Sequence, residues 1–119
     1  MIKLEAWSEA AARELLRATS DEVLPLIKSE VERGISQLYH CKDDYSDCYI
    51  VTRMELAPLE WCFVAAAGHG CMKYARMFVA EGKARGISMR CHVVKDSLLR
   101  LWGRLGFEVS EKVLRVKAS

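Results

Sequence analysis

A short glycine turn, Gly68-His69-Gly70, has the residue types best suited to ligand binding in this chain. It separates an apolar run, 61–67, from a segment whose apolar residues recur with the period of a helix. A strand, a glycine turn and a helix N-terminus leave several backbone N–H groups unpaired and directed at one place, where an anion can accept hydrogen bonds. The sequence therefore predicts either a phosphate site or an ordinary tight strand-to-helix turn.

The charges of the expected helix bear on that choice. Lys73 and Arg76 occupy its first two turns, and no acidic residue occurs between Trp61 and Ala80. Cations at a helix N-terminus oppose the helix dipole by about 0.3–1 kcal/mol, and a bound phosphate would reverse the sign of that effect. On the turn alone, solvated basic side chains beside a tight turn are the simpler interpretation, because short Gly-x-Gly patterns are common.

Size and composition limit the classes of function. The chain has 119 residues, 51% of them hydrophobic, and a formal net charge of +2, which suits a single globular domain over 1–119. Lysine and arginine are scattered, so no basic surface indicates a nucleic-acid partner. No apolar run is long enough to cross a bilayer, and the N-terminus lacks a signal-peptide pattern. We expect a cytoplasmic protein without membrane contact; a homodimer or another protein partner stays open.

The five cysteines are odd in number and lack the spacing of a disulfide framework, which favours reduced thiols. His40-Cys41 with Cys48, and Cys91-His92, suggest zinc as an alternative. No Cys-x-x-Cys pair occurs, and three of the five cysteines fall on apolar faces, where free cysteine usually packs. We therefore expect no metal.

Periodicity and turn residues predict the order of the elements. The expected elements are a strand over 2–6, a helix capped by Ser8, a helix from the capping-box pair Thr19 and Glu22 to Val31, strands over 35–40, 48–55 and 61–67, a helix from Cys71 to Arg85, a strand over 87–94, a helix over 96–105, and a final strand over 107–116 interrupted near 110–112. Pro25 either kinks the second helix or begins it. Short links make the middle three strands an antiparallel meander, and the helix between 61–67 and 87–94 makes that pair parallel.

This order, with the glycine turn between the fourth strand and the third helix, resembles the GNAT (Gcn5-related N-acetyltransferase) superfamily. Family members carry Arg/Gln-x-x-Gly-x-Gly/Ala at the turn, and residues 65–70 read AAAGHG. The family often shows Asn-x-x-Ala-x-x-Leu-Tyr-x-x-x-Gly-Phe, and residues 95–107, KDSLLRLWGRLGF, match at Leu101, Gly106 and Phe107. The resemblance implies an α/β (α+β) fold with a GNAT-like mixed sheet in the order β-α-α-β-β-β-α-β-α-β.

The resemblance also implies acetyl-CoA as the acyl donor. Its diphosphate would lie on the turn, where Gly68 and Gly70 let the phosphate approach the backbone, and its pantetheine arm between the fourth and fifth strands. The residues implied to contact the coenzyme are Phe63, Val64, Ala65, Ala66, Gly68, His69, Gly70, Cys71, Lys73, Arg76 and Lys95.

The chain departs from the family pattern at four positions. Ala65 replaces the usual Arg or Gln, Lys95 stands where Asn is common, and Leu98 where a small residue is usual. Trp102 occupies the place of the Tyr that in many members protonates the departing thiolate, and an indole has no proton that dissociates at a useful pKa. These departures count against coenzyme binding and, more strongly, against catalysis.

Acetyl transfer to an amine also needs a base, and Glu55, Glu60 and His92 are the candidates on strands near the expected coenzyme site. Each has a structural interpretation too: the two glutamates flank a turn and suit solvent, and a lone strand histidine is often packed. Tyr49 or Tyr74 could replace the missing tyrosine, and the spacing selects neither.

Two functions of different class follow. The first is an acetyl-CoA-dependent N-acyltransferase acting on an unidentified amine. The alternative is a catalytically inactive GNAT-fold binding or structural protein, for example virion-associated or regulatory. A different phosphate-binding α/β domain fits less well, because the antiparallel strands before the turn do not suit a Rossmann unit.

Overall fold

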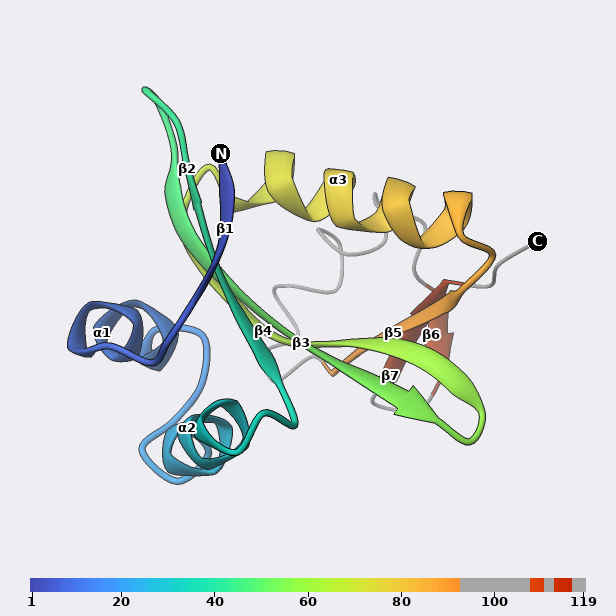
Figure 1. Cartoon of the computed structure of the whole chain (residues 1–119), viewed down its shortest axis with the longest axis horizontal. Coiled ribbons are helices and arrows are strands. Elements are labelled where there is room, and N and C mark those ends of the chain that lie inside the picture. The colour runs from blue at the N-terminus through green and yellow to red at the C-terminus, as the bar shows by residue number, and fades with distance from the viewer. Residues whose placement is uncertain (93–107, 111–112, 117–119) are drawn as a thin grey trace.

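A mixed sheet of seven strands, in the order β1-β2-β3-β4-β5-β7-β6, organises the part of the chain that the computed structural model describes, residues 1–92, 108–110 and 113–116 (Figure 1). The strands are β1 (Ile2–Glu5), β2 (Gln37–Lys42), β3 (Asp47–Leu56), β4 (Leu59–His69), β5 (Ser88–His92), β6 (Glu108–Ser110) and β7 (Val113–Val116). The helices are α1 (Glu9–Leu16), α2 (Leu24–Glu32) and α3 (Cys71–Ala84).

The strand directions confirm the expected topology. Strands β2, β3 and β4 form the antiparallel meander, and β4 pairs with β5 in parallel after the crossover through α3. The expectation of one interrupted final strand is wrong, because β6 and β7 pair with each other antiparallel and β7 also pairs antiparallel with β5. Over so few residues, the alternation of apolar and polar side chains does not show that the chain reverses direction between two strands. The strand pairing shows it.

The helices cover opposite faces of the sheet. Figure 1 shows α3 on one side and α1 with α2 on the other. Successive side chains of β3 alternate between these faces, as a pleated strand requires: Cys48 and Ile50 belong to the core under α3, whereas Tyr49 and Val51 belong to the core under α1 and α2. Because both faces are covered there, residues 48–51 of β3 form a continuous apolar run.

The starts of α1 and α2 differ in how well the sequence predicts them. Ser8 caps α1 as expected, with its Oγ accepting a hydrogen bond from Ala11 N at 3.1 Å. The capping-box expectation for α2 is wrong, because Thr19 Oγ1 instead donates to Leu15 O at 2.7 Å. Helix α2 begins later, at Leu24, and Pro25 occupies its first turn. A hydroxyl between two helices can hydrogen-bond the end of the first or the start of the second, and the sequence spacing alone does not determine which.

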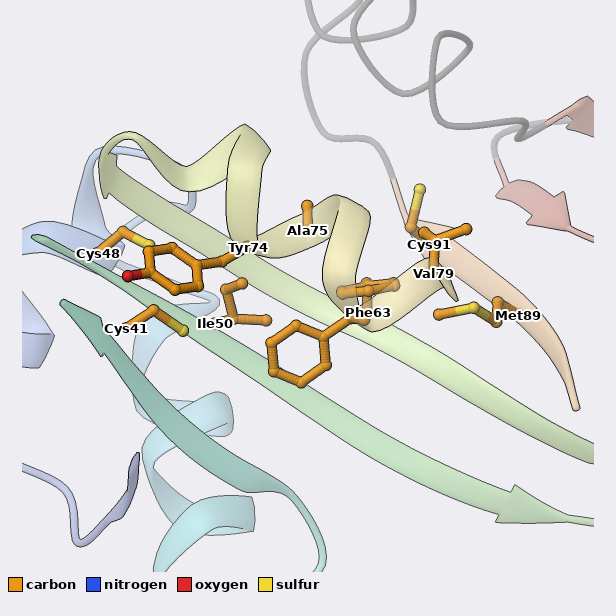
Figure 2. Close-up of a cluster of buried hydrophobic side chains, with 10 residues drawn as sticks. Cys41, Cys48, Ile50, Phe63, Tyr74, Ala75, Val79, Met89 and Cys91 are labelled. Carbon is orange, nitrogen blue, oxygen red and sulfur yellow. The ribbon is translucent and has the colours of Figure 1, made fainter. Parts of the chain in front are cut away.

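Helix α3 buries the face that its periodicity predicts. Tyr74, Ala75, Phe78 and Val79 are all buried, and they belong to the same core cluster as Ile50, Phe63 and Met89 of the sheet (Figure 2). The Phe78 ring lies 5.1–5.9 Å from the rings of Tyr39, Trp61 and Phe63. Aromatic contacts at these distances add to the free energy of burial, so α3 is held firmly over β4.

The expected helix over 96–105, with Lys95, Leu98 and Trp102, lies outside the described residues. In the described ranges, none of the three helices has the length and apolar character needed to cross a bilayer.

Two neighbouring leucines of α1 test its packing. Leu15 is fully buried against the sheet, whereas Leu16 is 40% exposed. We expect Leu15→Ala to lower the free energy of unfolding by about 2–5 kcal/mol, because it removes buried methyl groups and leaves a cavity. Leu16→Ala, a matched change in the same turn, should cost well under half as much. Urea denaturation of both variants measures the difference, and equal losses would contradict the packing of α1.

Candidate functional site

Strands β4 and β5 pair over only the first part of β4. Their parallel register ends where Phe63 meets Cys91, while β4 continues to His69. Beyond Phe63, the other edge of β4 stays paired with β3, but the edge toward β5 has no strand partner among the described residues. Backbone N–H and C=O groups on such an edge can hydrogen-bond an extended ligand.

A β-bulge occurs where the two strands part. Val51 pairs with Ala65 and Thr52 with Phe63, so Val64 is an extra residue on β4. A bulge redirects the side chains of its strand. Both Val64 and Ala65 consequently pack toward the core under α1 and α2, instead of alternating.

The glycine turn leads directly into α3. Gly70 has a left-handed φ of 74° and precedes the first helical residue, Cys71. No side chain caps the helix, and its first turn contains no acidic residue. His69 is exposed beside it. The first amides of α3 therefore keep the capacity to bind an anion that the sequence predicts.

The two glycines of the turn are required by packing. A Cβ added to Gly68 would lie 2.6 Å from Asp47 O and from Cys48 Cα, and one added to Gly70 would lie 2.2 Å from Ser46 Oγ. The sequence argument attributed both glycines to the approach of a phosphate. The structure reveals a nearer cause, because the start of β3 packs directly against the turn.

The two cations of α3 differ in their surroundings. Lys73 Nζ lies 2.7 Å from Asp43 Oδ2, and the Tyr74 hydroxyl donates to the same oxygen at 2.7 Å. These contacts hold the pKa of Asp43 well below its usual range and raise the pKa of Tyr74 to about 12. Arg76 is exposed, with no ion pair in the described ranges. Arg76 is therefore the more available cation, and Tyr74 is a poor proton donor.

The candidate bases Glu55 and Glu60 share one arginine that the sequence analysis missed. Arg90 hydrogen-bonds Glu55 through Nη2, and its Nη1 lies 3.4 Å from Glu60 Oε1. Arg53 joins Glu55 at 2.9 Å and Glu30 of α2 at 2.9 Å. The network lies on the α1 and α2 face. The sequence could have indicated Arg90 as a site residue, because the strand alternates. Met89 and Cys91 lie on its apolar face, and Arg90 lies on the opposite, polar face.

The electrostatics separate the two glutamates. Burial alone would raise the pKa of Glu55, but the hydrogen bonds and charges of Arg53 and Arg90 outweigh it and lower that pKa. A lowered pKa makes Glu55 a weaker base. Glu60 is 6% exposed and lies on β4 itself, where it is the Cα partner of Ser88 at the start of β5.

The remaining predicted site residues do not form a common site within the described part of the chain. His92 ends β5, opposite Val113 of β7. Lys95 and Trp102 lie outside the described residues. Tyr49 is stacked on His40, with 4.4 Å between the ring centroids, and burial raises its pKa.

His40, a candidate zinc ligand in the sequence, is hydrogen-bonded to two carboxylates instead. The two ring nitrogens of His40 lie 3.2 Å from Glu5 Oε2 and 2.6 Å from Asp47 Oδ1. In residues 1–92 and the two described C-terminal strands, no group of three or more His, Cys, Asp or Glu side chains is arranged to hold a metal ion.

A groove of about 490 Å³ lies on the α3 face, away from these glutamates. Tyr39, Trp61, Met77 and Phe78 contribute to its walls, and none of the predicted site residues lines it. We do not assign it to the candidate site.

Comparison with known proteins supports the fold only. No protein-family model and no curated protein sequence matches this chain. Among solved structures, the chain is similar to Tetrahymena GCN5, with a TM-score of 0.61 and 6% sequence identity. The similarity covers 98% of this chain and 96% of that one. The fold is thus GNAT-like, as the resemblance implied.

Two glycines with the same backbone conformation test the packing of the turn. Gly70 and Gly34 have φ values of 74° and 76°, but an added Cβ meets Ser46 only at Gly70 and nothing within 4 Å at Gly34. Both alanine variants bear a left-handed strain of about 1–2 kcal/mol. We expect Gly70→Ala to lower the free energy of unfolding further, and Ser46→Gly to restore part of that loss. Equal losses in denaturation experiments would contradict the close contact.

The stability contributed by His40 should fall as the pH rises. Burial lowers the pKa of His40, but hydrogen bonds and charges from Asp47 and Glu5 outweigh it and raise that pKa above 6.5. Such a group stabilises fully below its unfolded-state pKa, and the contribution is lost as pH passes through the folded-state pKa. The unfolding free energy of the wild type minus that of His40→Gln should therefore be largest near about pH 5.5 and decline above about pH 6.5. A difference that grows with pH would contradict the assignment.

Proposed function

We propose that this protein is an acetyl-CoA-dependent N-acyltransferase of the GNAT type that acts on an amine. One observation carries the proposal: beyond Phe63, β4 has no partner on its β5 side among the described residues, and it then leads through the glycine turn to the N-terminus of α3, which no side chain caps. Such a strand edge next to a helix N-terminus would suit a ligand that has an extended amide-bearing arm and a diphosphate.

The diphosphate would be bound by the backbone amides of Gly68, His69, Gly70 and Cys71. Anions at helix N-termini gain both from these donors and from the helix dipole. Arg76 is the side chain best placed to add a charge. Lys73 contributes less in this proposal, because Asp43 already neutralises it.

The arm would lie along β4 between Phe63 and Ala66. Ala65 and Ala66 are only partly buried and have small side chains, which suits the close approach of an extended ligand. Acetyl-CoA supplies a thioester, and a backbone N–H of β4 would donate a hydrogen bond to its carbonyl oxygen. Such a donor stabilises the negative charge that develops on this oxygen during acyl transfer. No particular side chain is needed for this step, so Ala65 does not oppose it.

Glu60 is the base that the surroundings favour. Glu60 Oε1 lies 3.4 Å from Arg90 Nη1, whereas Glu55 hydrogen-bonds two arginines, which lower its pKa and make it the weaker base. The acceptor amine would then approach on the α1 and α2 face, toward which this network is directed. His92, Lys95 and Trp102 stay as predicted contributors.

A second candidate is a GNAT-fold protein that binds without catalysis. The observation that favours it is the pairing of both candidate bases with Arg90, together with the pairing of Lys73 with Asp43. Charges satisfied by the protein itself are expected where a site has lost its chemistry. This candidate differs from the first in forming no acetylated product.

Titration with coenzyme tests the donor site. At a hundred times its Kd, acetyl-CoA should raise the free energy of unfolding by about 2.7 kcal/mol. Acetyl-pantetheine, which has the arm but no diphosphate, should bind much more weakly. Arg76→Gln should weaken acetyl-CoA binding several-fold, while Lys83→Gln, an equal loss of charge in the last turn of α3, should leave it unchanged. Calorimetry gives each affinity.

The outcomes separate the two candidates. No acetyl-CoA binding, or equal binding of acetyl-pantetheine, would refute the donor site. Binding with acetylation of primary amines, followed by mass spectrometry over a panel of amines, supports the enzyme. Glu60→Gln should then reduce the rate about 100-fold or more, as expected for a general base. Binding without any acetylated amine supports the second candidate.

A further inference from the structure

Strand β1 forms one edge of the sheet. It pairs with β2 on one side, and its other side has no strand partner among the described residues. Lys42 N donates to Met1 O at 2.8 Å, and the Met1 amino group donates to Lys42 O at 2.6 Å. Because such mutual pairs involve every second residue of an antiparallel strand, Ile2 and Leu4 direct their backbone N–H and C=O groups away from β2. A further strand can pair with them there.

The side chains of the same two residues are exposed apolar groups. Ile2 is 38% exposed and Leu4 is 61% exposed. Their Cα partners on β2 are Cys41 and Tyr39, which lie in the core under α3 or pack against it, so Ile2 and Leu4 lie on that face of the sheet. Ile2 also lines the groove on the α3 face. A strand added to this edge therefore gains apolar contacts as well as hydrogen bonds.

The other two residues of β1 have opposite charges, and both lie on the face of α1 and α2. Lys3 is exposed, with no ion pair in the part of the chain that the structure describes. Glu5 is half-buried, and its Oε2 lies 3.2 Å from His40 Nδ1. A lysine by itself discourages other strands from pairing at an edge. A lysine followed two residues later by a glutamate instead selects a strand that presents the same charges in reverse order, as an antiparallel second copy of β1 does.

We propose that two copies of this chain associate through their β1 edges, antiparallel and about a two-fold axis, with Leu4 opposite Leu4 of the second copy. Directly opposite residues share a face of the sheet, so a symmetric antiparallel pair is centred on one residue. Centring on Lys3 or on Glu5 would place like charges directly opposite, which is unfavourable. Centring on Leu4 places Lys3 opposite Glu5 on both sides of the axis. The charges therefore select this register.

The backbone geometry suits the same register. Leu4 directs its N–H and C=O outward, so the two copies exchange a mutual pair of hydrogen bonds at the axis. Lys3 and Glu5 then form the pairs without mutual hydrogen bonds, in which the side chains lie closer together. Ile2 and Leu4 of both copies extend along one face as a single apolar strip beside the groove. The pairing involves the edge strand β1, which two strands separate from β4, so the inference does not rest on the proposed function.

Sedimentation equilibrium of the full chain over a range of concentrations tests the proposal. We expect a reversible dimer. Lys3→Glu and Glu5→Lys should each raise its Kd about tenfold or more, because each variant places two like-charged pairs across the axis. An equal mixture of the two variants should dimerise again, since the glutamates of one chain then face the lysines of the other. Lys28→Glu, the same change of charge at an exposed position of α2, should leave the Kd unchanged.

Three outcomes would overturn the proposal: a monomer at every concentration, a dimer that both charge reversals leave intact, or a mixture of folded variants that stays monomeric. Circular dichroism checks that each variant is folded.

A cysteine at the axis tests the register without any change of charge. Leu4→Cys should form a cross-linked dimer on mild oxidation, because mutually bonded residues of antiparallel strands have Cα atoms about 5.5 Å apart, within reach of a disulfide. Cross-linking no greater than that of the wild type under the same conditions would refute the register.

Discussion

The close packing of the start of β3 against the glycine turn is the contact on which the rest of the structure depends. Ser46 and Cys48 leave no room for a side chain at Gly70 or Gly68. This contact determines where β4 ends and where α3 begins, and therefore where the first amides of the helix point.

Two ionic groupings then define the character of the candidate site. At the start of α3, Lys73 pairs with Asp43, whereas the exposed Arg76 has no ion pair within the described ranges. On the α1 and α2 face, Arg90 of β5 contacts both Glu55 and Glu60. The hydrogen bonds and charges of Arg53 and Arg90 lower the pKa of Glu55 and make it a weaker base.

Sequence reasoning predicted elements better than it predicted contacts. The buried face of α3, with Tyr74 and Phe78, followed from the helical period, and the parallel pairing of β4 with β5 followed from the intervening helix. The beginning of α2 and the reversal between β6 and β7 did not follow. The start of α2 depends on which helix end the Thr19 hydroxyl hydrogen-bonds, and the reversal depends on which strands pair. Local periodicity determines neither.

The sequence by itself determined the order of the elements, the glycine turn and the resemblance to a GNAT fold, because periodicity and turn chemistry are local properties. Only the tertiary structure shows that Gly68 and Gly70 are required by their close contact with Cys48 and Ser46. It also shows that Lys73 pairs with Asp43 and that Arg90 binds both candidate bases. Each of these contacts joins residues far apart in the chain. The physical reason is that charge pairing and steric fit depend on distance in space, which the folded sheet creates.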